Sequence, residues 1–312
     1  MSGHILKNTL LLKNTLHAFL GKATAPGIAA RPAQRPSPRS YRFGQHAAIL
    51  LPGLVIAFIL LCAIAPGWIA PYTPSNMDYN AILSAPSWQH LLGTDQYGGD
   101  IATAIVYGAR QSVLVASGAI LLGAAGGSLI GMAAGYRGGV IDAVAMRLID
   151  IWMSIPPMLL ALIIAAALGG GFSSTVIAIA SMLVPRFARV IRSRVLGIKV
   201  LNFITAARAM GASRLWILWR HVLPHTATVI LVLATLGVAD AILIGASLSF
   251  IGLGVNPDQP DWGYLLSEGR NYLTDAWWYA SFPGIAITLL TVSVNLLGDA
   301  LRSRTDPTQG LK

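Results

Sequence analysis

Long apolar stretches alternate with polar and charged segments along most of this chain. Several stretches reach the roughly 20 residues that a helix needs to cross the hydrocarbon core of a bilayer. The pattern predicts an all-α membrane protein with six transmembrane helices and one large loop that is itself helical. The predicted spans are residues 48–70, 112–135, 143–168, 174–192, 226–254 and 282–301.

Small residues and prolines recur within these spans. Pro156 and Pro157 in the third span and Pro185 in the fourth lack a backbone donor, so they are expected to kink or interrupt their helices. Glycine lets two helices approach closely in lipid, and the second span is rich in it. We expect a packed helix contact along Gly123, Gly126, Gly127, Gly131 and Gly135.

The composition favours a membrane protein over a soluble or disordered one. Of the 312 residues, 55% are hydrophobic and 11% are charged, whereas soluble domains carry about a quarter charged residues. The net charge of +10 could indicate a nucleic-acid binder, but Lys and Arg lie between apolar spans instead of on one water-exposed face. We therefore expect no nucleic-acid partner. The chain has a single cysteine, Cys62, in the first span, so it cannot form an intrachain disulfide.

Charge and hydropathy divide the chain into three regions. Residues 1–45 form a basic tail without an acidic residue, residues 46–308 contain the six spans, and residues 309–312 form a short end. Lys13 interrupts the only apolar run of the tail, so the tail lacks the core of a cleaved secretory signal. We expect a surface-lying amphipathic helix there, followed by a proline-rich linker.

The charged residues between the spans predict the orientation of the chain, because Lys and Arg are retained on the cytoplasmic side of membrane proteins. With residues 1–45 inside, the loops on that side hold most other basic residues, and only Arg110 and Arg270 lie outside. Acidic residues gather in the two outer segments, about 71–111 and 255–281. Both termini are therefore predicted to be cytoplasmic.

Motifs for ATP hydrolysis and metal chemistry are missing from the sequence. A phosphate-binding loop needs GxxxxGK followed by Ser or Thr, but the only Gly-Lys pair, at 21–22, is followed by Ala23. The six histidines are scattered and form no HExxH pair. We expect this chain to be no enzyme and to bind no metal or cofactor itself.

The internal loop 196–225 is more apolar and helix-forming than a solvent loop needs to be. Its alanines favour helix, Gly211 permits a turn, Ser213 can cap a second short helix, and Pro224 is expected to limit that helix. The sequence predicts two short amphipathic helices at a membrane surface.

This loop resembles the EAA loop of ABC importer permeases, in which a short helix inserts into a groove on an ATPase subunit. The family's first Glu is replaced by Thr205 in this chain. The resemblance implies that Ala207 faces the ATPase subunit. The residues that it assigns to the coupling loop are Thr205, Ala206, Ala207, Arg208, Gly211, Ala212, Ser213, Leu223 and Pro224.

Further motifs resemble the peptide and nickel branch of these permeases, and the second, C-type subunit of dipeptide and oligopeptide importers in particular. Gly99 replaces that branch's usual Arg. The resemblance covers residues 45 to 308. The motifs are HLLGTDQYGGD at 90–100, YGARQS at 107–112, LSFIGLG at 248–254, DWG at 261–263, NLLGDALR at 295–302 and DP at 306–307.

The resemblance implies a multi-pass permease of the bacterial inner membrane that forms half of a translocation pathway. Its implied partners are a homologous second permease, two ATPase subunits that bind ATP and Mg, and an external solute-binding protein. Short peptides are the expected solute, and nickel or a metal-chelate complex is the alternative within the branch. An ion-coupled secondary transporter is the alternative from another class, because broken helices occur there too. The motifs assign no substrate-binding residue.

Four charged residues within the predicted spans are candidate polar sites, because a charge in lipid needs a partner or water. Arg147 and Asp150 are three residues apart and are expected to pair with one another. Asp299 has Arg302 at the same spacing. Asp240 has no charged neighbour within a turn, so we expect it to face a partner subunit, polar groups of the bundle or a wet pathway.

Overall fold

The structure is a computed structural model that describes residues 38–254 and 259–305. The chain divides into two units, Met1–Gly44 and Gln45–Lys312, and the architecture below is that of the second unit. Within the described residues, the regular structure is helical apart from two isolated β-bridges. The helix and linker predicted before residue 38, and the end at 309–312, lie outside the described residues.

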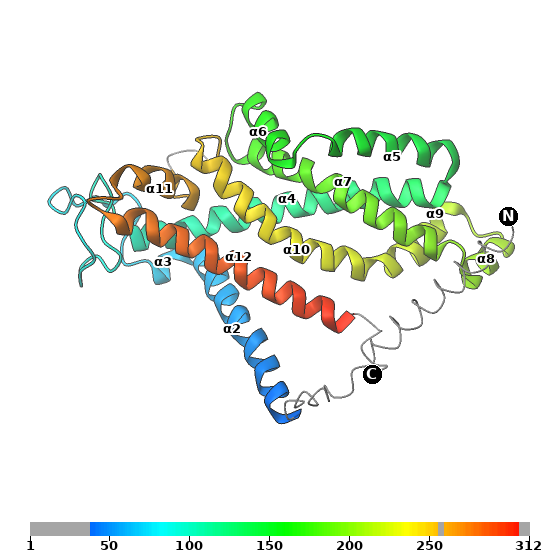
Figure 1. Cartoon of the computed structure of the whole chain (residues 1–312), viewed down its shortest axis with the longest axis horizontal. Helices are drawn as coiled ribbons and strands as arrows, with labels where there is room; N and C mark the ends of the chain where they lie inside the picture. The colour runs from blue at the N-terminus through cyan, green and yellow to red at the C-terminus, as the bar shows by residue number, and fades with distance from the viewer. Residues whose placement is uncertain (1–37, 255–258, 306–312) are drawn as a thin grey trace, which may run out of the picture. The chain divides into compact units, whose positions relative to one another are not determined.

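Long helices run side by side through the second unit (Figure 1), with α4 and α10 each in contact with α7, with α12 and with one another. Short helical segments connect them at the two ends. The longer helices are α2 (Pro38–Ile64), α4 (Ile101–Arg137), α5 (Gly139–Met153), α6 (Pro157–Ala167), α7 (Phe172–Ile198), α10 (Leu223–Phe250) and α12 (Trp277–Thr305). The shorter ones are α3 (Pro66–Ile69), α8 (Asn202–Ala209), α9 (Arg214–Ile217), the π-helix η1 (Leu218–Val222), α11 (Trp262–Gly269) and the 3₁₀-helix η2 (Arg270–Tyr272).

The predicted all-α membrane fold is confirmed, but six full spans are not. Helices occur at all six predicted places. By length and hydropathy, four of the described helical segments can each cross a membrane: Ile101–Arg137, Phe172–Ile198, Arg214–Phe250 and Trp277–Ser303. Helices α5 and α6 qualify only as a pair, and the apolar helix Ile49–Ile64 is shorter.

The prolines act differently in the third and fourth predicted spans. Between α5 and α6 the chain bends by 87°, and Pro156 and Pro157 lie at this break, as predicted. By contrast, Pro185 lies within α7, which does not end there. A helix in lipid tolerates proline where neighbouring helices hold it, and α7 packs along α4 on both sides of this residue.

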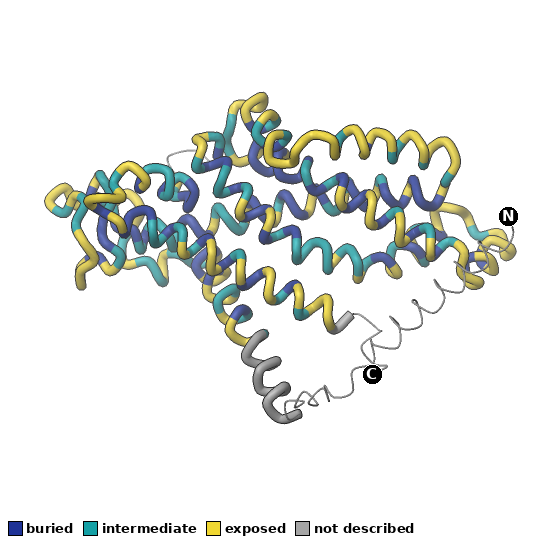
Figure 2. The backbone as a smooth tube through the Cα atoms, in the orientation of Figure 1, coloured by how far each residue is buried: buried dark blue, intermediate teal, exposed yellow. Residues whose placement is uncertain are grey.

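The α4–α7 seam is the most tightly packed contact of the bundle, and the glycines of α4 explain why. A Cβ at Gly127 would lie 2.5 Å from both the Phe187 Cβ and the Val184 carbonyl oxygen. Glycines recur every four residues along this line, so the backbones meet without side chains between them. Figure 2 shows α4 and α7 buried along this contact, whereas α5 is exposed along most of its length. The predicted contact is confirmed for Gly123, Gly127, Gly131 and Gly135, while Gly126 has only an ordinary contact.

Helix α4 begins at Ile101, earlier than the predicted start of the span near residue 112. The Asp100 carboxylate accepts a hydrogen bond from the Thr103 backbone N–H at 2.7 Å and so caps the helix. His90 Nδ1 lies 3.0 Å from the other oxygen of Asp100, and both side chains are buried. These contacts give the motif at 90–100 a structural role, which is to start the helix.

Residues 71–100 and α11 cover one end of the bundle, whereas α8 and α9 lie at the opposite end (Figure 1). Gln96 connects the two covering segments, because its amide N–H donates to Glu268 at 2.7 Å and its carbonyl accepts from the Tyr272 hydroxyl at 2.6 Å. The Trp262 indole N–H donates to the Ile105 carbonyl of α4 at 2.8 Å. The cover is therefore attached directly to the bundle.

Candidate functional site

The loop between α7 and α10 contains the helix, turn and capped helix that the sequence predicts. Gly211 follows α8 with φ of +83°, a conformation that glycine adopts at little cost and β-branched residues rarely adopt. The Ser213 hydroxyl oxygen then accepts a hydrogen bond from the Trp216 backbone N–H at 3.2 Å and caps α9. Helix α8 and the turn are thus held in a defined shape.

Helix α8 has one buried face and one exposed face. Ile204 and Ala207 are buried at 0% and 3% exposure, within a cluster that includes Ile191 and Val195 of α7. The expectation that Ala207 faces a partner subunit is therefore wrong, because its methyl group packs against this chain. The exposed residues of α8 and its turn are Asn202, Phe203, Thr205, Ala206, Arg208, Ala209, Met210 and Gly211.

Aromatic and cationic contacts attach this loop to the bundle. The Arg208 guanidinium carbon lies 5.2 Å from the ring centre of Tyr136, which belongs to α4. Phe203 stacks on His225 of α10 with the ring centres 5.1 Å apart. These contacts join α8 to the ends of both α4 and α10.

Pro224 does not limit the second short helix, contrary to the sequence prediction. The segment Arg214–Phe250 is continuous and long enough to cross a membrane. Leu223 and Pro224 fall in the first turn of α10, directly after the π-helix η1. The wider π-turn changes the hydrogen-bond register, and such a local π adjustment lets a spanning helix tolerate a proline. The loop 196–225 thus continues into a helix long enough to span a membrane.

Three arginines of α7 form ion pairs with two neighbouring helices, and the sequence analysis missed this arrangement. Arg189 pairs with Asp150 of α5 at 2.6 Å, so the predicted pairing of Asp150 with Arg147 is wrong. The three-residue spacing of Arg186, Arg189 and Arg192 indicates one helix face, but it does not indicate which residues of other helices face them.

The other two pairs of this series differ in exposure. Arg192 donates twice to Asp142 of α5, and their side chains are 30% and 16% exposed. Arg186 Nη1 donates to Asp240 Oδ2 of α10 at 2.7 Å, and these side chains are 44% and 53% exposed. Asp240 therefore has a partner on another helix, which a search along its own helix could not find.

Arg147 and Asp299 take no part in the ion pairs of the described residues. Both residues are exposed in the single chain. The expected pairing of Asp299 with Arg302 is likewise not among these ion pairs, since helical spacing brings two side chains near each other without fixing their rotamers.

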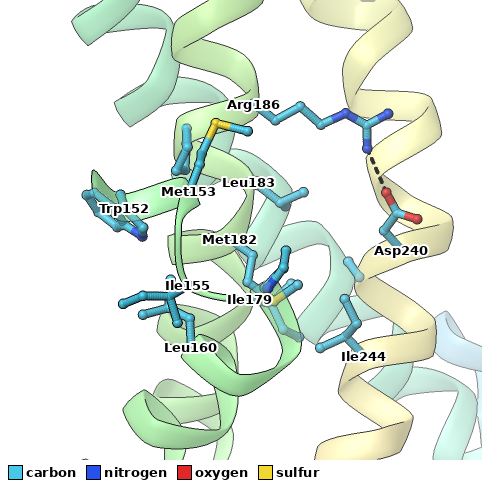
Figure 3. Close-up of a pocket in the computed structure, with 13 residues that line it drawn as sticks. Trp152, Met153, Ile155, Leu160, Ile179, Met182, Leu183, Arg186, Asp240 and Ile244 are labelled. Atoms are coloured by element: carbon cyan, nitrogen blue, oxygen red, sulfur yellow. Dashed lines mark hydrogen bonds and ion pairs between the residues drawn. The ribbon is translucent and has the colours of Figure 1, made fainter. Parts of the chain in front are cut away.

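A cavity of about 340 Å³ lies beside the Arg186–Asp240 pair. Its walls come from the break between α5 and α6 and from the facing sides of α7 and α10 (Figure 3). Apart from that pair, its lining is nearly all apolar, as with Leu160, Met182 and Ile244. The bent span therefore creates an apolar chamber with one cation and one anion at its side.

The part of the chain that contains these features matches a known family. The sequence pattern of the family "Binding-protein-dependent transport system inner membrane component" matches residues 127–308. This chain belongs to that family. Most of the α4–α7 seam, the loop 196–225 and the cavity all lie within the matched residues of this binding-protein-dependent permease.

Individual relatives agree with this assignment. The permease is 39% identical to the "Di/tripeptide transport system permease protein DppC" of Pseudomonas aeruginosa (strain UCBPP-PA14), over 81% of this chain and 86% of the relative. It is also 39% identical to the "Probable D,D-dipeptide transport system permease protein DdpC" of Escherichia coli (strain K12), over 83% and 87%.

A solved structure supports the fold. One chain of the inward-facing MetNI methionine ABC transporter aligns with this permease at a TM-score of 0.51 and 18% identity. The alignment covers 65% of this chain and 97% of that chain. At this identity the similarity concerns the arrangement of the helices alone.

Proposed function

We propose that this permease is one of two membrane subunits of an ABC importer and forms half of a pathway for short peptides. The observation that carries the proposal is the α8 loop, a rigid helix and turn with one exposed face at one end of the spanning helices. A loop attached to both α4 and α10 can transmit motion from a docked subunit into the membrane.

ATP hydrolysis is assigned to partner subunits in this proposal. Two ATPase subunits bind ATP and Mg²⁺, one of them receives α8, and a homologous second permease completes the pathway. An external solute-binding protein delivers the solute to the opposite end, where residues 71–100 and α11 form the cover.

The proposed orientation places α8 and both termini in the cytoplasm of a bacterium and residues 71–100 outside. Single cysteines introduced at Asn76 and Arg214 test it, because both positions are exposed. Asn76 belongs to the segment 71–100 and Arg214 to α9, and these elements lie at opposite ends of the bundle. We expect a membrane-impermeant thiol reagent to label the cysteine at 76 in intact cells, and the one at 214 only after lysis. Labelling at 214 in intact cells would contradict both the orientation and the coupling role of α8.

Short peptides are the proposed solute because relatives named for dipeptide and tripeptide transport match most of this chain. The test is uptake of a labelled dipeptide by proteoliposomes that contain both permeases and the ATPases, with binding protein outside. ATP-dependent dipeptide uptake supports the proposal. Uptake of nickel or a metal chelate instead would favour the alternative solute.

The coupling role of the loop is tested by Gly211→Val, with Gly197→Val as the matched control. A Cβ at either position would meet open space, but only Gly211 has positive φ. Valine at 211 strains the turn by about 1–2 kcal/mol, so we expect roughly a tenfold loss of ATP-driven uptake with normal insertion. Gly197→Val should retain uptake.

Ala206→Glu tests the exposed face of α8 directly, because Ala206 is exposed whereas Ala207 is buried. A carboxylate at 206 leaves the chain's own packing intact but buries a charge against a docked subunit, which is unfavourable without a partner. We expect loss of ATPase copurification. Normal copurification and uptake in both loop variants would contradict the proposal, and uptake driven by an ion gradient without ATP would favour a secondary transporter.

A further inference from the structure

The Arg186–Asp240 pair lies far from the helix ends yet is half exposed. Arg186 belongs to the spanning helix α7 and Asp240 to the spanning helix α10, with 44% and 53% of their side chains exposed. Exposed charges are costly against hydrocarbon and mark contact with protein or water inside a membrane. This face of α7 and α10 is therefore turned toward the pathway or the second permease and away from lipid.

The chamber beside this pair has the size and lining of a small-molecule site. Its volume of about 340 Å³ falls within the range of roughly 300–1,000 Å³ that is typical of ligand pockets. Figure 3 shows the ion pair on one side and the apolar side chains of Leu160, Ile179 and Ile244 on the other. A ligand that fits this site is mainly apolar and carries both a positive and a negative charge.

A short peptide with free ends has this chemistry, because it has one ammonium group, one carboxylate and a largely apolar body between them. The planar guanidinium of Arg186 can bind the peptide carboxylate in a bidentate manner, and the Asp240 carboxylate can accept from the ammonium. The single hydrogen bond that joins Arg186 to Asp240 at 2.7 Å is then exchanged for two ion pairs. The total charge within the membrane does not change.

The Arg189–Asp150 pair provides a matched comparison on the same helix. It has nearly the same length, 2.6 Å, and nearly the same exposure, 50% and 55%. Neither of its residues lines the chamber. Any effect specific to Arg186 and Asp240 therefore comes from their position beside the chamber and not from the general loss of an ion pair.

We propose that the Arg186–Asp240 pair and its chamber form a transient site for the two charged ends of a short peptide during translocation. Arg186 binds the carboxylate and Asp240 binds the ammonium, and the pair closes again when the peptide leaves. This inference rests on the proposed function, since it names the residues that contact the transported solute within the pathway.

The test uses the complete complex with both permeases and ATPases, in a Cys62→Ala background. A Met182→Cys substitution places a thiol in the chamber wall, and its rate of alkylation by a small maleimide is measured. The probes are alanyl-alanine and its N-acetylated, C-amidated derivative. Alanyl-alanine should slow alkylation, whereas the blocked peptide should not.

Variants then assign this protection to the ion pair. Asp240→Asn and Arg186→Gln should each raise the concentration of alanyl-alanine needed for protection about tenfold or more, the usual effect of losing a charged hydrogen bond. Asp150→Asn and Arg189→Gln should leave it unchanged. If either chamber variant is poorly recovered, Arg186→Lys keeps an attractive pair with Asp240 but cannot bind a carboxylate in a bidentate manner. It should still weaken the protection by alanyl-alanine.

Three results would overturn this inference. The blocked peptide could protect equally, which would make the chamber a general apolar pocket. The chamber variants could keep full protection. The thiol at 182 could be unreachable, in which case the chamber is closed to peptides. Because ATP-dependent dipeptide uptake by the unmodified complex is measured separately, such a failure is distinguishable from failure of the proposed function.

Discussion

The two faces of α7 are packed in opposite ways. Toward α4, the glycines bring two backbones together with little space between them. Toward α5, α6 and α10, α7 presents arginines and borders a chamber of about 340 Å³. Helix α7 thus has a closed seam on one side, where its backbone packs against α4, and an open face on the other, where it borders the chamber. This difference indicates that α4 and α7 move as one body, whereas rearrangement is easier across the open face.

The closed seam gives the largest predicted effect. In Gly127→Ala, the added Cβ would lie 2.5 Å from the Val184 carbonyl oxygen, so the helices must separate. We expect a loss of about 1–3 kcal/mol, typical of an overpacked core, seen as low yield and a lower Tm in detergent. In the control, Gly126→Ala, the nearest atom would be 3.5 Å away. Equal Tm values for the two variants would contradict a closed seam.

The ion pairs of α7 give the next effect. Arg192→Gln leaves the partly buried Asp142 without its two hydrogen bonds, so we expect a cost of about 1–3 kcal/mol. Arg189→Gln breaks a half-exposed pair and should cost about 1 kcal/mol or less. Thermal unfolding of the two variants in the same detergent measures the difference, and a larger loss for Arg189→Gln would reverse the proposed ranking.

The contrast between the two faces also shows what the sequence could predict. Glycine spacing within one helix predicted the closed seam, because glycines four residues apart lie on one face of α4 and let another helix approach there. Asp240 could not be matched to Arg186, because these residues are 54 positions apart and their contact depends on how α7 and α10 cross. The paired prolines predicted the break that opens the chamber, but not what faces it.

Ala207 illustrates a limit of the resemblance. The loop motif predicted a helix and a turn, and both are present, since local propensity and the positive φ at Gly211 determine them. Which face of a short helix is buried depends on the elements around it. For α8 these include the ends of α4 and α7, and they cover Ala207.

A filled chamber should affect transport more than stability. Ile244→Phe adds volume where the open face has space, so we expect a change in unfolding free energy within about 0.5 kcal/mol. Peptide uptake should fall because the chamber becomes smaller. A loss of stability as large as that of Gly127→Ala would show that this face is packed as tightly as the seam.

The smallest predicted effect concerns Asp261, which lies where α11 covers the ends of α4 and α10. Its carboxylate accepts from the Tyr264 backbone N–H at 3.0 Å and caps α11. Burial raises the pKa of Asp261, and hydrogen bonds from Tyr264, Ser249 and Gly263 only partly oppose this shift. The folded protein therefore holds the proton more tightly than the unfolded chain.

The sign of the pH dependence follows from this raised pKa. The stabilisation from protonated Asp261 is fully present below the unfolded pKa of about 3.9, and it is lost as the pH rises through the higher pKa of the folded state. Asp261→Asn cannot ionise and keeps an oxygen that can cap α11. The Tm of the variant minus that of the unmodified protein should therefore increase from pH 4 to pH 8.

Other carboxyls with raised pKa, such as Asp95, contribute equally to both proteins and cancel in this difference. A difference that stays constant or decreases over this range would show that Asp261 is ionised at no cost, and the end of the bundle covered by α11 would then be more open to water than the α4–α7 seam.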